Sequence, residues 1–221
     1  MIGRTQDRLF AACGIASVVL ELAGFGIASA GGRTHNLTIS SSAAQIAHAL
    51  AKPSGNLVWV GGYLELLSFG AFLAFAVWAC AKLGGGLLGA IGSAAGTSYA
   101  TLSVASLGLA DAIAYRAGHG LGVQLGSTLV TVNEALYVGT WFLSAFFLLA
   151  TGALALTSGR RMLGWSAVGI ALVTLVATAV SVESVGQFSV LLWLAWIVYA
   201  SIALARGERA PAHAVAVAQR A

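Results

Sequence analysis

The stretch that decides the fold is LVWVGGYLELLSFGAFLAFAVWACA, residues 57–81, in which Glu65 is the only charged residue. A helix needs about 20 consecutive apolar residues to cross the hydrocarbon core of a bilayer, so this stretch is long enough to span it. A carboxyl group at that depth is costly. An acid inside a membrane helix is therefore a candidate functional group.

Five further stretches of this kind lie on either side of it in the sequence. The predicted spans are residues 9–30, 57–81, 86–110, 135–158, 162–182 and 187–205. The chain is 59% hydrophobic and 8% charged, whereas soluble domains average about 25% charged residues. We therefore predict an all-α fold: a polytopic membrane helix bundle of six transmembrane helices, forming a single domain over 1–221, with 206–221 as a cytoplasmic tail.

Basic residues predict the orientation of these spans. Six spans place both termini on one side, together with Arg4, Arg8, Lys82, Arg160, Arg161, Arg206, Arg209 and Arg220. The other side has Arg33, Lys52 and Arg116. Because cytoplasmic loops carry the excess of Lys and Arg, we expect both termini in the cytoplasm. The Ala-, Gly- and Val-rich composition is typical of bacteria, which predicts the inner membrane.

Two carboxylates lie deep in predicted spans. Glu21 is nine residues inward from Ala30, and Glu65 is eight residues inward from Leu57. At 1.5 Å per residue, both lie roughly 12–14 Å below the outer boundary. A buried carboxyl is either protonated or paired, so it can pass on a proton or hold a cation. Glu21 and Glu65 are thus candidate catalytic or ligand-binding residues; a hydrogen bond between helices is the structural alternative.

Three more acids, Asp111, Glu134 and Glu183, lie at the outer ends of spans. Span ends are wet and tolerate charge, so a solvated role competes with a functional one for all three. Asp111 and Glu134 are the two that we include among the candidate ligand-binding residues.

Aromatic residues near these acids could form the walls of a binding site. Tyr63 lies just outside Glu65, and Tyr137 and Trp141 are one turn apart on the fourth span. We include these three among the candidate ligand-binding residues. The alternative is the belt of Trp and Tyr that membrane proteins place at headgroup level, which also accounts for Trp59.

The sequence favours no metal and no cofactor. His35, His48 and His119 are scattered over two predicted loops without the spacing of metal ligands. No Walker A, G-x-S-x-G or H-E-x-x-H motif is present. Because the basic residues lie at span ends, they indicate topology rather than a nucleic-acid partner. The expected partner is the lipid bilayer.

Two outer loops are predicted. In the first, residues 31–56, Ser42 and Gln45 have the spacing of a capping box, which indicates a short amphipathic outer helix over 43–51. The second, residues 112–133, is glycine-rich and apolar, and we expect it to be an irregular segment that dips into the membrane.

The third span carries a glycine pattern formed by Gly85, Gly89, Gly92 and Gly96. Small residues four apart let helix backbones approach closely. Packing at the centre of the bundle is the first interpretation. A homo-oligomer contact through the same four glycines is the alternative.

The order of these features resembles a family of small bacterial six-helix inner-membrane proteins known only as a domain of unknown function. The resembling segments are SAAQIAHALA in the first outer loop, AFAVWACAKLGGG at a basic turn, and NEALYVGTWFLSAFFLLATGALAL before a second basic turn and MLGW. The resemblance implies the same topology. It implies no catalytic or binding residues.

The sequence leaves three functions open. The preferred one is binding or transport of a small apolar or cationic molecule, or of a lipid, at an outward-facing site with buried acids. The second is an intramembrane enzyme that uses a protonated carboxyl on a lipid or isoprenoid, as cyclases and isomerases do. The third is an accessory or sensor subunit, in which the glutamates only join helices.

Overall fold

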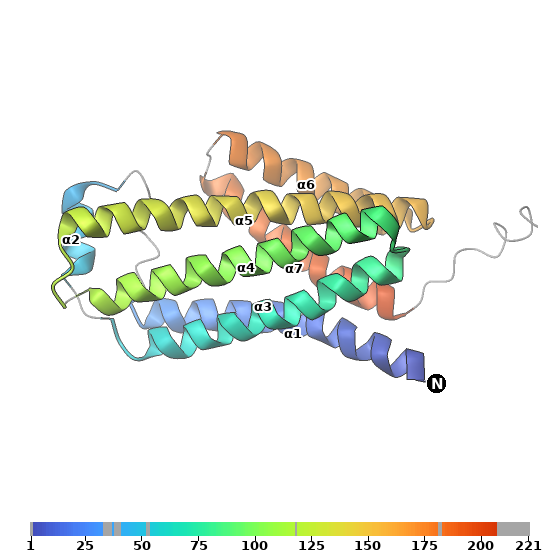
Figure 1. The fold of residues 1–221 in the computed structure, drawn as a ribbon, viewed down its shortest axis with the longest axis horizontal. Helices are drawn as coiled ribbons and strands as arrows, with labels where there is room; N and C mark the ends of the chain where they lie inside the picture. Colours follow the sequence, from blue (N-terminus) through green and yellow to red (C-terminus); the bar gives the residue numbers. More distant parts are fainter. Residues whose placement is uncertain are drawn as a thin grey trace, which may run out of the picture. The chain divides into compact units, whose positions relative to one another are not determined.

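Every element of regular structure in the described part of the chain is an α-helix (Figure 1). The computed structural model describes residues 2–32, 37, 41–51, 54–117, 119–180 and 183–206. The helices are α1 (Ile2–Ala30), α2 (Ala43–Leu50), α3 (Leu57–Leu83), α4 (Gly86–Arg116), α5 (Val123–Thr157), α6 (Arg161–Val180) and α7 (Glu183–Ala205). Arg33, His35, Lys52 and the predicted tail after Arg206 lie outside the described residues.

Five segments are long and apolar enough to cross a membrane: Thr5–Ala30, Leu57–Leu83, Val123–Thr157, Arg161–Ala179 and Phe188–Ala205. They confirm the prediction of an all-helical protein with several candidate spans. Helix α4, which contains the predicted span 86–110, is equally long but is not among the five. Its many glycine, serine and threonine residues make it less apolar.

The predicted irregular loop over 112–133 is wrong for most of its length. Helix α4 continues to Arg116 and α5 already begins at Val123, so residues 117–122 connect them. Polar residues had marked the ends of the predicted spans, but a polar side chain does not end a helix. At 1.5 Å per residue, α5 extends about 50 Å, which exceeds the roughly 30 Å of a hydrocarbon core.

Helix α2 packs on the neighbouring ends of α4 and α5 (Figure 1). The predicted capping box is confirmed: Ser42 accepts a hydrogen bond from Gln45 N, and the Gln45 side chain accepts one from Ser42 N. Ile46 and Leu50 are buried in a cluster with Ile113, Ala117 and Val130. Helix α2 therefore covers apolar surface of α4 and α5.

The chain forms two compact units, and α1, α3, α4 and α5 each contribute to both. Unit 1 comprises Met1–Ile15, Ala74–Thr97 and Leu143–Ala221, and unit 2 comprises Ala16–Leu73 and Ser98–Phe142. The core of unit 1 is aromatic: Phe147 is fully buried and meets Trp193 and Trp196 edge-on. The single domain predicted over the whole chain stays a prediction.

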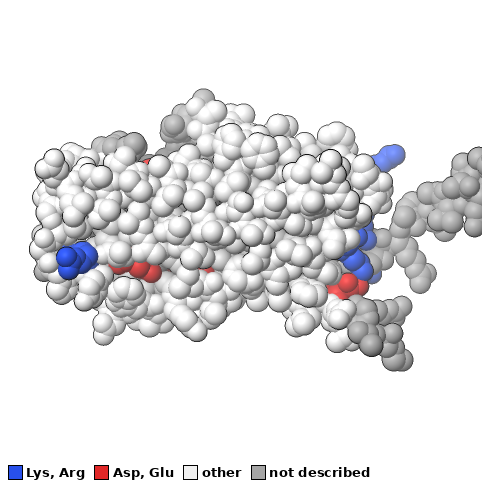
Figure 2. Space-filling model, in the orientation of Figure 1, with Lys and Arg blue, Asp and Glu red and all other residues white. Residues whose placement is uncertain are grey.

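Apolar side chains also cover much of the outside. The exposed large residues include Leu22, Phe25, Val60, Phe142, Trp165 and Val176. On the face drawn in Figure 2, nearly all atoms belong to uncharged residues. A water-facing protein of this size could not keep such a surface without association, whereas lipid is a suitable solvent for it.

Candidate functional site

Helices α1 and α3 are in direct backbone contact within unit 2. A Cβ atom built on Gly24 would lie 2.8 Å from Gly61 O and 2.9 Å from Glu65 N. One built on Gly61 would lie 2.5 Å from both Ala28 N and Gly24 O. Only glycine fits at these two positions. The sequence analysis did not single them out, although Gly24 and Ala28 are small residues four apart, which is a packing signal in membrane helices.

Both deep carboxylates face this α1–α3 contact. The Glu65 side chain lies over Gly24 of α1, since a Cβ on that glycine would come within 2.7 Å of Glu65 Cγ. In the opposite direction, Glu21 of α1 reaches α3, where Ser68 Oγ donates a hydrogen bond to Glu21 Oε2 at 2.5 Å. Glu65 is 6% exposed and Ser68 2%. The structure thus brings the two glutamates to one interface.

Ser68 joins Glu21 of α1 to α3, and we refer to Glu21, Glu65 and Ser68 as the acid–serine cluster. Ser68 Oγ is 2.5 Å from Glu21 Oε2 and also 2.7 Å from the main-chain oxygen of Glu65. A hydroxyl has one hydrogen, so it cannot donate fully to two acceptors. With a proton on Glu21, the carboxyl would donate to Ser68 Oγ and Ser68 would donate to Glu65 O. Ser68 was not predicted as a site residue, because nothing in the spacing of the sequence pairs it with Glu21.

The three candidate wall residues, Tyr63, Tyr137 and Trp141, also belong to unit 2. Tyr63 is 64% exposed whereas Glu65, two residues further, is buried, so they project from different sides of α3. Tyr137 and Trp141 contact each other edge-on, with ring centroids 5.3 Å apart. Trp59 is half-exposed and meets Tyr115 in the same way, at 5.8 Å.

The acids at the predicted span ends are distributed over three helices. Asp111 on α4 is buried, and Glu134 on α5 is half-buried. A hydrogen bond of 3.0 Å joins α4 to α5 near these acids, from Ser106 Oγ to Asn133 Oδ1, and Asn133 directly precedes Glu134. Glu183 begins α7, and its side chain lies outside the described ones.

No cluster of three or more metal-binding side chains occurs among the described residues. His48 is exposed on α2. His119 is exposed too, and its ring stacks on Tyr115 at 5.5 Å. Neither lies in a constellation that would hold a cation.

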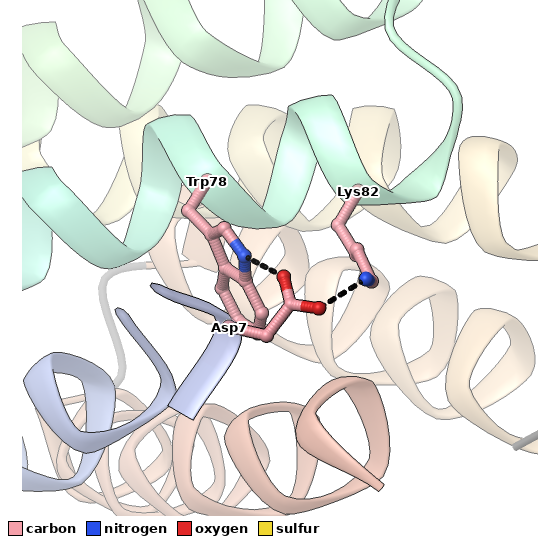
Figure 3. Close-up of polar contacts among 3 residues, drawn as sticks. All are labelled: Asp7, Trp78 and Lys82. Carbon is pink, nitrogen blue, oxygen red and sulfur yellow. Dashed lines mark hydrogen bonds and ion pairs between the residues drawn. The ribbon is translucent and has the colours of Figure 1, made fainter. Parts of the chain in front are cut away.

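Unit 1 has a second polar contact between α1 and α3, which the sequence analysis did not foresee (Figure 3). Asp7 Oδ1 accepts a hydrogen bond from Trp78 Nε1 at 3.0 Å, and Asp7 Oδ2 forms an ion pair with Lys82 Nζ at 2.6 Å. Phe10 stacks on the Trp78 ring one turn further along α1. This Asp7 clamp (Asp7, Trp78 and Lys82) fixes the start of α1 against the end of α3.

The clamp predicts a measurable coupling between its two charges. Asp7→Asn keeps an acceptor for Trp78 but removes the ion pair, whose side chains are 26% and 33% exposed. We expect it to lower the free energy of unfolding by about 0.5–1 kcal/mol. Lys82→Gln should cost a similar amount, and the double variant little more than either. The free energies of unfolding of the wild type, the two single variants and the double variant, measured in detergent, form a double-mutant cycle. If the two single effects add fully in the double variant, the clamp is contradicted.

Two glycines of α4 are covered by the same chain, within unit 1. A Cβ on Gly92 would lie 2.8 Å from Cys80 Sγ and 3.3 Å from Ala150 Cβ. One on Gly96 would lie 3.0 Å from Ala76 Cβ. Both glycines therefore pack against other helices of the same chain. The homo-oligomer contact through Gly85, Gly89, Gly92 and Gly96 stays a prediction.

The fold and its apolar surface define the class: an all-helical protein with several helices fit to cross a membrane. No protein-family model, no curated protein and no solved structure matches the chain. A function for this protein is therefore inferred from its own residues.

Proposed function

We propose that this membrane protein binds, and carries across the bilayer, a small apolar or cationic molecule or a lipid. Glu21 and Glu65 are the acids of its site, and the site opens to the outer side. The observation that supports this is the acid–serine cluster, in which Glu21 of α1 bonds to Ser68 of α3 and the Glu65 side chain lies over Gly24 of α1, at the same contact.

An ionisable group in hydrocarbon costs free energy. If the two glutamates only joined α1 and α3, a glutamine or serine pair would do so without placing ionisable groups in hydrocarbon. Intramembrane acids are expensive and are kept where they serve a pathway, a relay or a ligand. A proton on Glu21, bonded to Ser68, is one that an arriving cation could displace, which would couple binding to protonation.

Tyr137 and Trp141 are proposed as walls of the same site, and Asp111 and Glu134 as polar groups near its outer end. Tyr63 is proposed for the rim, since its ring is largely exposed. All belong to unit 2, together with the acid–serine cluster.

We further infer six spans, with α4 as the sixth, and both termini in the cytoplasm of a bacterial inner membrane. Basic residues are in excess at the ends assigned to the cytoplasm, namely the start of α1, the end of α3, the turn between α5 and α6, and the end of α7. This excess supports the orientation. Single cysteines introduced at Gly120 and Gly159, in a background without Cys13 and Cys80, test it. A membrane-impermeant thiol reagent added to intact cells should label position 120 and spare position 159; the reverse pattern would overturn the orientation.

Titration with tetraphenylphosphonium, an apolar cation, tests the proposed function. We expect the purified protein to bind it and the Glu21→Gln, Glu65→Gln double variant to bind it at least tenfold more weakly, because the neutral amides cannot compensate the cation's charge. Asp7→Asn, which removes a carboxylate from unit 1, is the matched control and should bind normally. Equal affinity in wild type and the double variant would argue against a cation site at these acids.

A further inference from the structure

The charges of unit 1 are strongly unbalanced. Among the side chains that the structure describes there, five are cationic: Arg8, Lys82, Arg160, Arg161 and Arg206. Asp7 is the one carboxylate in the same set, and it is bonded to Lys82. The four arginines therefore remain as net positive charge.

Packing within unit 1 places three of these cations at a common end. A Cβ on Gly14 of α1 would touch both Phe75 of α3 and Ser201 of α7, so the three helices meet there. From that contact α3 and α7 run on to Lys82 and Arg206, while α1 runs back to Arg8. The Asp7–Lys82 ion pair confirms this direction for α1 and α3.

The turn between α5 and α6 adds two arginines in a defined geometry. Gly159 has φ +79°, and Arg160 N bonds to Ala155 O at 2.8 Å, so α5 ends in a tight turn. Arg160 precedes α6, and its carbonyl oxygen accepts from Gly164 N at 3.0 Å. An arginine side chain only donates, so it cannot cap the first N–H groups of α6.

One guanidinium atom at this turn needs an acceptor as well. Arg160 Nη1 is buried and has no hydrogen-bond partner among the described residues. A buried donor without an acceptor is costly, more so when it is charged. Oxygens of an anionic group can accept hydrogen bonds from a guanidinium and from the first N–H groups of a helix.

The surface next to this turn is apolar and open. Met162 is 79% exposed and Trp165, one turn into α6, is 64% exposed. Trp at such a position is typical of the boundary between headgroups and acyl chains. Cations beside exposed apolar side chains match a molecule with both an anionic head and a hydrocarbon tail.

We propose that the start of α6 is a binding site for an anionic phospholipid. Arg160 and Arg161 bind the phosphate together with the first N–H groups of α6, and Met162 and Trp165 contact the acyl chains. The site lies in unit 1 and does not depend on the proposed function of Glu21 and Glu65.

Native mass spectrometry of the protein in a neutral detergent tests this site, with dioleoyl phosphatidylglycerol, dioleoyl phosphatidylcholine and inorganic phosphate as probes. We expect phosphatidylglycerol to bind at least fivefold more tightly than phosphatidylcholine. A basic residue near an anionic headgroup contributes roughly fivefold, so Arg160→Gln, Arg161→Gln should reduce its binding about 25-fold. Arg116→Gln, an exposed arginine of unit 2, is the control and should change nothing.

The other outcomes overturn the proposal. They are equal binding of the two lipids, an effect of Arg116→Gln as large as that of the double variant, and complete displacement of phosphatidylglycerol by millimolar phosphate, which would indicate a site for free phosphate. If the double variant fails to fold, Arg161→Gln alone is informative. The Arg161 side chain is exposed, and we expect Arg161→Gln to weaken the binding of phosphatidylglycerol about fivefold.

Discussion

Replacing Gly61 with leucine is expected to lower the free energy of unfolding by about 3 kcal/mol or more. A Cβ at this position would lie 2.5 Å from Ala28 N and Gly24 O, and both atoms belong to the backbone of α1. A flexible side chain could move away, but a helix backbone cannot do so without separating α1 from α3. Thermal or denaturant unfolding of the purified protein in detergent measures the effect.

Gly70 provides the matched control. It lies on the same helix, α3, and nothing lies within 4 Å of a Cβ built on it. Gly70→Leu should therefore be neutral or slightly stabilising, because leucine is a better helix former than glycine by roughly 1 kcal/mol. If the leucine at position 61 were tolerated as well as the one at position 70, the close contact of α1 and α3 would be wrong.

The second large effect is expected from the Glu21→Gln, Glu65→Gln variant, which should lose any small molecule that the wild type retains during purification. Glutamine keeps the shape of the side chain and can still accept from Ser68, so the α1–α3 contact should survive. It can neither hold a transferable proton nor compensate a cation. We therefore expect loss of ligand with a change in the free energy of unfolding below about 2 kcal/mol.

The sequence was sufficient for the helices because their signal is local. The predicted spans 57–81, 162–182 and 187–205 correspond to α3, α6 and α7 within a few residues. Ser42 and Gln45 predicted the start of α2. The ends of α4 and α5 could not be read in this way. There the helices continue beyond the apolar stretch, and contacts with α2 stabilise turns whose own sequence is glycine-rich.

The candidate site depended on information that a local pattern does not contain. The cost of a buried charge was enough to select Glu21 and Glu65, and their depths agreed. That both face the same contact depends on which sides of α1 and α3 meet, and small residues at Gly24, Ala28 and Gly61 determine this. For the same reason the sequence did not indicate the partners of Asp7, which lie far along the chain.

The most direct test of the central claim is mass spectrometry of the small molecules that co-purify with the protein. The wild type, the Glu21→Gln, Glu65→Gln variant and the Asp7→Asn control would be compared after identical solubilisation. We predict a molecule that the wild type and the control retain and the double variant lacks; a chemically altered product would instead favour the intramembrane enzyme. The same molecules in all three samples, with the double variant only less stable, would contradict the claim and leave Glu21 and Glu65 as structural residues of the α1–α3 contact.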